Sequence, residues 1–409
     1  MWNSAVKRNM KNYLRSITLM LLTFLLMNEA AGQARKSSEE YLKRAEDIYQ
    51  LIWTKYRVKE YGLFSENYPS GRGANLDYFQ EGAVKEKEVS FLWPFSGLFS
   101  ATNVLIKHPS LRQKYLPYLD SLATGMEQYK DTLRKPVGYQ AYPVRFEKVD
   151  RYYDDNGLVS IDYMESYFNT KNPVYLERAR VVFEFILSGW DEKLGGGVTW
   201  LEGHRDQKPA CSNGMATLAA LKIYEATRDP YYLKWGEKFY NWMHDNLRDS
   251  AGVYVNDIKI DGTVNKTYYT YNSGSMLEAS VLLYKFKNDE KYLKEAKIIA
   301  QGAFNHFSVP EADGTREFQV DLPWFTTVLF RGYESLYHID GNYKYIEAIT
   351  RKLDHAWENS RDKYGLVTYN WTSAPEELAK PKWLLNETCI AELYGRLSLL
   401  NKKAARQKK

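Results

Sequence analysis

Residues 213–243, NGMATLAALKIYEATRDPYYLKWGEKFYNWM, contain two helical patterns of different kinds. The first, over residues 213–226, is apolar or small on nearly every side, which is typical of a helix buried all round. The second carries a single apolar stripe at helical spacing, formed by Leu233, Gly236, Tyr240 and Met243. Asp229 and Pro230 supply the capping side chain and the first-turn proline with which such a helix begins. The stretch therefore predicts a buried helix followed by an amphipathic one.

The same alternation recurs through most of the chain. The amphipathic template occurs six times, with first positions at Leu42, Leu116, Leu176, Leu233, Leu293 and Ile346. Six less polar helical segments lie between or after these, beginning near Trp93, Asp155, Ser212, Asn272, Trp324 and Glu387. Repeats at this period form either an open solenoid or a closed ring, and the long, irregular connectors favour closure. We predict an all-α fold, an (α/α)6 barrel with six inner and six outer helices, over residues 35–401.

The two ends of the 409-residue chain differ from this body. Residues 1–34 have a basic start, an apolar run and small residues near Ala34, a pattern that predicts a cleaved signal peptide and a periplasmic or extracellular protein. The apolar run is about half the ~20 residues that span a bilayer, so we expect no stable membrane anchor. Residues 402–409 are expected to be a basic, disordered tail. The net charge of +5 comes from these ends, which disfavours nucleic acid as a partner; we expect a monomer.

If each connector leads into an inner helix, the six inner helix starts gather at one rim of the barrel. Aromatic, amide and acidic residues are concentrated there, and this composition is typical of a sugar-binding cleft. Within it we predict substrate contacts from Trp93, Tyr153, Asn156 and Trp324.

Asp154 and Asp155 are the sharpest feature of this rim. Glycosidic cleavage requires two carboxyl groups, about 5–5.5 Å apart in enzymes that retain the anomeric configuration and farther apart in those that invert it. Neighbouring residues at a helix start can meet the shorter separation, so the adjacency favours retention. An acidic pair at this position can also serve only as a cap and a complement to the helix dipole.

Four segments together resemble glycoside hydrolase family 76, the bacterial endo-α-1,6-mannanases: residues 152–157 (YYDDNG), 195–200 (GGGVTW), 208–213 (KPACSN) and 270–274 (TYNSG). The resemblance implies an (α/α)6 barrel and retaining hydrolysis of α-1,6-linked mannan or manno-oligosaccharides. It implies that Asp154 is the nucleophile and Asp155 the general acid/base. It also implies that mannose units are held by Trp200, Asn213, Tyr271 and Asn272.

Other functions remain open or are disfavoured by the residues. A non-catalytic barrel that binds α-mannan, and a transglycosylase of the same family type, are the alternatives. An isoprenoid enzyme would need a third aspartate where Leu158 stands. Six His and two Cys are too dispersed for a zinc cluster, so we expect no metal and no cofactor. Cys211 and Cys389 begin inner helices on opposite sides of the ring, which predicts free thiols.

Overall fold

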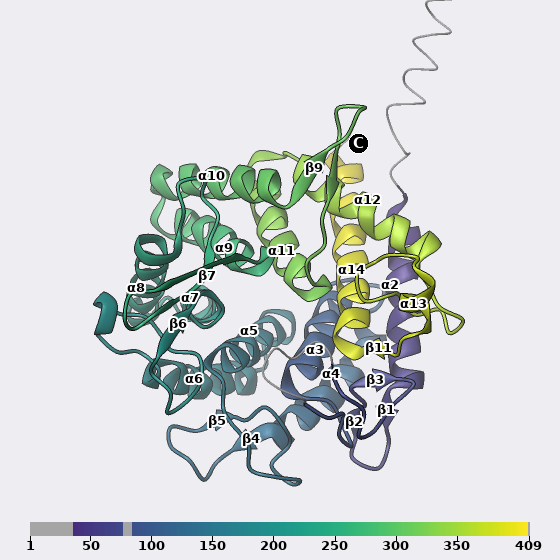
Figure 1. The fold of residues 1–409 in the computed structure, drawn as a ribbon, viewed down its shortest axis with the longest axis horizontal. Helices are drawn as coiled ribbons and strands as arrows, with labels where there is room; N and C mark the ends of the chain where they lie inside the picture. The colour runs from purple at the N-terminus through teal and green to yellow at the C-terminus, as the bar shows by residue number, and fades with distance from the viewer. Residues whose placement is uncertain (1–35, 77–83, 408–409) are drawn as a thin grey trace, which may run out of the picture.

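The computed structural model describes residues 36–76 and 84–407, and these form a double ring of helices (Figure 1). The inner ring consists of α3 (Leu92–Ile106), α5 (Tyr153–Thr170), α7 (Ala210–Thr227), α9 (Thr270–Lys287), α11 (Pro323–Asp340) and α14 (Leu384–Gln407). The outer ring consists of α2 (Ser38–Lys55), α4 (Arg112–Met126), α6 (Pro173–Ser188), α8 (Pro230–Leu247), α10 (Glu290–His306) and α12 (Lys344–Asn359). The prediction of an (α/α)6 barrel is confirmed.

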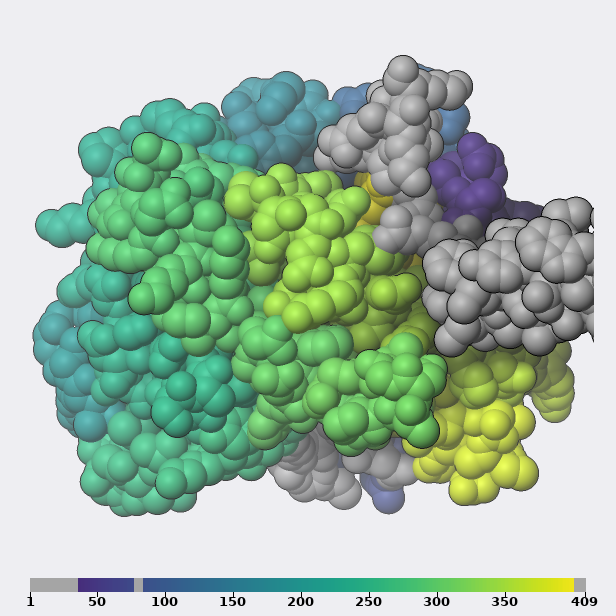
Figure 2. Space-filling view, turned by 90° about the horizontal axis from the view of Figure 1, so that it is seen from above, coloured from purple at the N-terminus to yellow at the C-terminus, as the bar shows by residue number. Residues whose placement is uncertain are grey.

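Helix contacts close the ring. Each inner helix touches the next, from α3 through α5, α7, α9, α11 and α14 back to α3, and an outer helix covers each of them. The apolar stripe found in the sequence is the buried face of the outer helices: Tyr240 and Met243 of α8 are buried. Seen from above, α10 and α12 lie next to each other on the outer surface (Figure 2), where Lys344 Nζ lies 2.7 Å from Gln301 Oε1.

Short antiparallel strands brace the connectors. The pairs are β1 (Arg57–Val58) with β2 (Leu63–Phe64), β3 (Asn67–Tyr68) with β11 (Lys382–Trp383), β4 (Lys130–Asp131) with β5 (Gly138–Tyr139), β9 (Ser308–Pro310) with β10 (Arg316–Phe318), and β7 (Val255–Lys259) with both β6 (Gln207–Pro209) and β8 (Val264–Tyr268). Three short helices, η1 (Glu127–Tyr129), η2 (Lys193–Gly195) and α13 (Pro375–Ala379), complete the described elements. The β3–β11 pair joins the first connector to the last, where the two ends of the ring meet.

The fourth residue of several inner helices fastens the preceding connector to the barrel. Asn156 Oδ1 accepts the Tyr139 N–H at 2.7 Å, and Asn213 Oδ1 accepts the Val198 N–H at 2.7 Å. At the same helix position, Ser273 and Glu387 accept the N–H groups of Tyr254 and Val367, respectively. Because buried backbone groups must find partners, one polar side chain at each of these positions fixes where the connector lies over the rim.

Paired charges cross the barrel interior along the later turns of the inner helices. Arg331 Nε lies 2.7 Å from Glu392 Oε1, and both side chains are buried. Lys222 Nζ of α7 bridges Glu278 of α9 at 2.8 Å and Glu165 of α5 at 3.0 Å. Such groups are tolerated in a core only when paired. The helical pattern of the sequence does not reveal this network.

The ends of the chain are described in part. Helix α14 runs to Gln407, so residues 402–407 are helical where a disordered tail was predicted. The segment contains Lys, Ala, Arg and Gln, which are all good helix formers, and its basic residues suit the C-terminal end of a helix. Residues 408–409 and the predicted signal peptide lie outside the described residues. Within the described ranges, no helix is both long and apolar enough to cross a membrane.

Candidate active site

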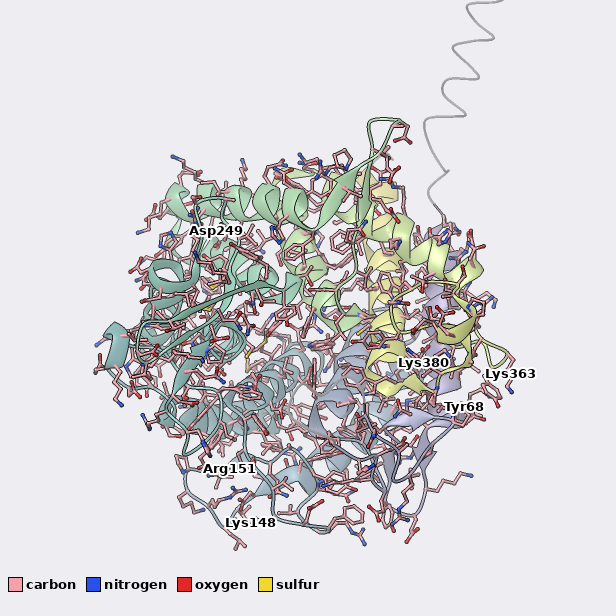
Figure 3. The ribbon with its side chains drawn as sticks, in the orientation of Figure 1. Tyr68, Lys148, Arg151, Asp249, Lys363 and Lys380 are labelled. Carbon is pink, nitrogen blue, oxygen red and sulfur yellow. The ribbon has the colours of Figure 1, made fainter. Side chains whose placement is uncertain are left out.

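The aspartate pair lies in the first turn of α5, and Arg151 fixes how the chain enters that turn. Arg151, labelled in Figure 3, is buried and forms an ion pair with Glu202 from the next connector. Its guanidinium also donates to the Pro136 carbonyl at 2.9 Å and lies over the Phe185 ring. A buried cation with this many partners holds the backbone just before Asp154 in one position.

Two backbone hydrogen bonds attach the segment that carries Trp200 to the same helix start. Tyr153 N–H donates to the Trp200 carbonyl at 2.9 Å, and Glu202 N–H donates to the Arg151 carbonyl at 3.1 Å. The segment turns back on itself at Gly195–Gly197, whose φ angles of +74°, +133° and +93° favour glycine. The result is that the Trp200 indole Nε1–H reaches Asp154 Oδ2 at 3.1 Å.

The two carboxyl groups have different hydrogen-bond environments. Asp154 accepts from Trp200 Nε1 at 3.1 Å and from the Asp155 N–H at 2.9 Å. No donor within the described part of the chain bonds the Asp155 carboxyl. Both side chains are partly exposed, so a ligand in the cleft can reach them.

These environments shift the two pKa values to different extents. Burial raises the pKa of Asp155 well above its ordinary value, and the neighbouring charge of Asp154 raises it further. Burial also raises the pKa of Asp154, but its hydrogen-bond donors oppose the shift because they stabilise the ionised form. Asp154 is therefore the member of the pair that ionises more readily, and Asp155 is the one that keeps a proton.

Cys211 and Tyr271 begin the next two inner helices at the position that Asp154 holds on α5. Burial and the charge of Asp154 raise the pKa of the Cys211 thiol well above its ordinary value. The ring of Tyr271 stacks on Phe325 with centroids 4.0 Å apart, and Phe325 stacks on Trp93 at 5.9 Å. These aromatic side chains are partly exposed at the inner helix starts and form one continuous arc that leads away from Asp154.

Asp154, Cys211, Tyr271 and Phe325 occupy equivalent positions on four successive inner helices, and three glycines explain why they meet. A Cβ added to Gly157 would lie 2.5 Å from Met215 Cβ, and one added to Gly214 would lie 3.0 Å from Ser275 Cβ. A Cβ on Gly274 would lie 2.5 Å from the Leu329 backbone. Gly157, Gly214 and Gly274 lie three residues after Asp154, Cys211 and Tyr271, respectively. The residues that they face on the next helix, Met215, Ser275 and Leu329, lie four residues after Cys211, Tyr271 and Phe325, respectively. Because each glycine lets two neighbouring inner helices approach closely, the side chains one turn before it, at the rim, lie near one another.

Several residues predicted to hold substrate have packing roles instead. Tyr153 is buried, with its ring stacked on Phe185 at 4.8 Å. Asn156 and Asn213 are fully buried, and backbone groups of the connectors satisfy their amides. Trp324 is buried beneath the Arg331 guanidinium, and its neighbour Phe325 faces the rim. These four placements correct the sequence-based predictions; the physical reason is that one-residue steps on a helix turn side chains by about 100°.

The other predicted contacts differ in their exposure. Trp93, Trp200 and Tyr271 are partly exposed at the inner helix starts. Asn272 is fully buried one position beyond Tyr271, and its amide has no hydrogen-bond partner within the described residues. From the sequence, Trp324 rather than Phe325 was chosen as the substrate contact of its helix start, and Cys211 was not identified as a neighbour of Asp154. One sequence signal could have revealed that Asp154, Cys211 and Tyr271 hold equivalent positions. Each begins a four-residue segment that ends on a glycine, at residues 157 (DDNG), 214 (CSNG) and 274 (YNSG).

Other polar residues lie apart from the aspartate pair. Asp162 is a buried carboxyl bonded by Ser96, and His204 is an exposed loop residue. Cys211 and Cys389 are free thiols. Over the ranges that the structure describes, no three His, Cys, Asp or Glu side chains gather as metal ligands would.

Residues 118–405 match the family model described as glycosyl hydrolase family 76. The matched region is most of the chain and contains every residue of the aspartate site described above. The protein therefore belongs to glycosyl hydrolase family 76, a family of glycoside hydrolases.

Solved structures and curated relatives agree with this assignment. The family 76 mannosidase Bt3792 of Bacteroides thetaiotaomicron has 28% sequence identity and a TM-score of 0.77, over 89% of this chain and 100% of that one. The α-1,6-mannanase GH76A of Salegentibacter sp. HEL1_6, an inactive variant in complex with α-1,6-mannotriose, shares the fold at 22% identity and a TM-score of 0.70, over 88% of this chain and 99% of that one.

The curated relatives match over a shorter segment. The mannan endo-1,6-α-mannosidases DCW1 of Candida glabrata and Saccharomyces cerevisiae are 32% and 30% identical over 131 and 136 residues. These segments cover 29% and 31% of this chain and under a third of the relatives' own length, at 29% and 30%.

Proposed function

We propose that the protein hydrolyses α-1,6-mannosidic linkages in α-mannan with retention of configuration. The observation that carries the proposal is the difference between two adjacent carboxyl groups: Asp154 accepts hydrogen bonds from Trp200 Nε1 and the Asp155 N–H, whereas burial and a neighbouring charge favour a protonated Asp155. One ionised and one protonated carboxyl group are what double displacement requires. The α-1,6 linkage is supported by the names of the fungal relatives, and action on mannosides by the name of Bt3792.

In this mechanism Asp154 attacks the anomeric carbon while Asp155 donates its proton to the departing glycosidic oxygen. The products of the first step are a mannosyl ester on Asp154 and a free sugar hydroxyl. Asp155, now ionised, takes a proton from water, which attacks the same carbon and releases Asp154. The half-exposed rings of Trp93, Tyr271 and Phe325 offer flat surfaces for neighbouring mannose units.

Separate Asp154→Asn and Asp155→Asn variants test the two roles. On linear α-1,6-mannan, each should lose at least about a hundredfold in turnover, the scale typical of a lost acid, base or nucleophile. Asp206→Asn is the matched control, because Asp206 is an exposed carboxyl in the neighbouring connector. Near wild-type turnover in either site variant, with the control unchanged, would refute the assignment.

Azide separates the nucleophile from the acid/base residue. With an activated aryl α-1,6-mannobioside, Asp155→Ala should yield an α-mannosyl azide, because the covalent intermediate still forms and azide displaces Asp154. Asp154→Ala should yield a β-mannosyl azide by direct attack. The reverse pattern would exchange the roles, and bound mannan without new reducing ends would favour the binding-protein alternative.

We also propose that the protein is exported. Residues 1–34 support this through their charge and hydropathy pattern. N-terminal sequencing of the protein recovered from cells that express the full chain tests it: the mature chain should begin near residue 35, and an intact Met1 would contradict export by cleavage.

A further inference from the structure

The side chain of Lys208 is buried at the end of the connector that leads into α7. Lys208 lies in β6, two residues before α7 begins, and none of its side chain is exposed. Its Nζ lies 2.7 Å from Asp191 Oδ1 and donates to the backbone carbonyl groups of Asp191 at 3.1 Å, of Lys193 at 2.6 Å and of Gly196. Each proton of the buried ammonium therefore has an acceptor.

The oxygens around Lys208 belong to one loop, residues 191–197, which reverses the direction of the chain. Leu194 and the glycines at 195–197 all have positive φ angles. Three carbonyl groups of this loop point at one nitrogen atom, and the Trp242 indole N–H of α8 donates to a fourth, that of Leu194, at 3.0 Å. Because buried carbonyl groups need donors, side chains of β6 and α8 keep the 191–197 loop closed.

The 191–197 loop leads directly into Trp200, whose indole N–H donates to Asp154 Oδ2 at 3.1 Å. Between the two, the Val198 N–H donates to Asn213 Oδ1 at 2.7 Å. The Trp200 carbonyl accepts the Tyr153 N–H at 2.9 Å. These bonds attach the segment to α7 and α5, whereas the ammonium fixes the loop from which the segment emerges. The position of the indole therefore depends on both attachments.

A buried cation lies at the same place in two other connectors. Arg151 and Lys382 also lie two residues before their inner helices, α5 and α14, and both are buried. Lys382 Nζ donates to the carbonyl groups of Glu377 at 3.2 Å and Leu378 at 3.1 Å in its own connector. Lys208 differs from Lys382 because its loop leads into a side chain that bonds Asp154.

We propose that Lys208 is a positioning residue of the active site: its ammonium keeps the 191–197 loop closed and thereby places the Trp200 indole on Asp154. Lys208 needs no contact with the sugar, because it acts through Trp200. The inference rests on the proposed function, in which ionised Asp154 is the nucleophile. Without the ammonium, three carbonyl groups lose a donor, and the loop must open to let water replace it.

Lys208→Met tests this role, because it keeps an unbranched apolar stem and removes the ammonium. The indole N–H stabilises ionised Asp154, so a displaced indole raises the pKa of Asp154 and moves the acid limb of kcat/KM to higher pH. Well down that limb, we expect kcat/KM to fall roughly three- to tenfold, and no further than in Trp200→Phe, which lacks the indole N–H altogether. Hydrogen exchange of the backbone amides at residues 195–198 should become faster.

A double variant separates the position of Trp200 from a direct effect of the Lys208 charge. In the Trp200→Phe background, Lys208→Met should move the acid limb no further, because the bond through which Lys208 acts is already gone. A shift that persists in this background would show that the ammonium acts on Asp154 through space, and it would overturn the proposal.

Lys382→Met is the matched control, since it removes a buried ammonium from the same position of another connector. It should lower the urea midpoint of unfolding, as Lys208→Met does, and leave the acid limb unmoved. An equal shift of the limb in Lys382→Met would mean that any loosening of the barrel produces the effect, and the specific role of Lys208 would be refuted.

Asp191→Asn carries the test if Lys208→Met does not fold. It removes the charge that lies 2.7 Å from Lys208 Nζ and leaves the three carbonyl groups in place; Arg205, which pairs with the other Asp191 oxygen at 3.0 Å, is exposed. The acid limb should move in the same direction by a smaller amount. An unmoved limb in a folded Lys208→Met or, failing that, in Asp191→Asn would overturn the proposal.

All variants are measured as the full chain on linear α-1,6-mannan. If Asp154→Asn is inactive and Trp200→Phe moves the acid limb, but Lys208→Met does not, only the role of Lys208 fails. If Asp154→Asn retains turnover, the proposed function fails first.

Discussion

Replacing Trp200 by Phe tests the indole N–H that donates to Asp154, the proposed nucleophile. The substitution keeps an aromatic ring beside Tyr152, whose centroid lies 5.0 Å away, and deletes the indole N–H that bonds Asp154 Oδ2 at 3.1 Å. A hydrogen bond to a charged group is worth about 1.5–3 kcal/mol, and partial exposure of both side chains argues for the lower end. A loss of about 1.5 kcal/mol corresponds to about a tenfold change in the ionisation equilibrium.

The direction of the pKa change in Trp200→Phe depends on which form of Asp154 the indole N–H stabilises. The indole favours ionised Asp154, so its loss raises the pKa of Asp154 and moves the acid limb of kcat/KM to higher pH. Well down that limb, where the rate is proportional to the ionised fraction, kcat/KM should fall about tenfold beyond any change on the plateau. The basic limb, assigned to Asp155, should move less.

The assay is the release of reducing ends from linear α-1,6-mannan as a function of pH. Trp190→Phe is a suitable control, because it deletes an indole N–H that bonds the exposed carboxylate of Glu192 at 2.9 Å. A uniform loss of activity at every pH, with the acid limb unmoved, would refute the reasoning and make Trp200 a substrate contact only.

Three further predictions concern the scaffold and are measured by urea denaturation. Asn213→Ala should cost about 2–4 kcal/mol, because it leaves the buried N–H and carbonyl of Val198 without their partner; a loss under 1 kcal/mol would contradict that role. Gly274→Ala should cost about 1–3 kcal/mol, since the new Cβ would lie 2.5 Å from the Leu329 backbone, and an unchanged midpoint would mean that α9 and α11 separate freely. Glu392→Ala should cost about 3–5 kcal/mol by leaving Arg331 buried without its bidentate partner, and a neutral effect would show that water reaches this part of the lumen.

The helix pattern of the sequence was enough to predict the barrel, because the buried face of a helix is recorded in the spacing of apolar residues along that helix alone. A stripe such as Leu233, Gly236, Tyr240 and Met243 reports which face of a helix is buried, because helical geometry places those side chains together whatever the fold. Six such stripes separated by buried helices leave few arrangements, and long connectors favour the closed one. The positions of Asp154 and Asp155 followed in the same way, from their place at the start of an inner helix.

Tertiary structure alone decided which rim residues face the cleft and which side chains surround the carboxyl groups of Asp154 and Asp155. Tyr153 and Asn156 flank the aspartates in sequence yet pack into the scaffold, whereas Cys211 and Tyr271, 57 and 117 residues beyond Asp154, complete its surroundings. Hydrogen bonds between different helices depend on how closely the backbones approach, and glycines at 157, 214 and 274 determine that distance. Sequence periodicity records the buried face of each helix; it does not record the spacing and rotation of one helix against the next, and the asymmetry between Asp154 and Asp155 arises from that spacing.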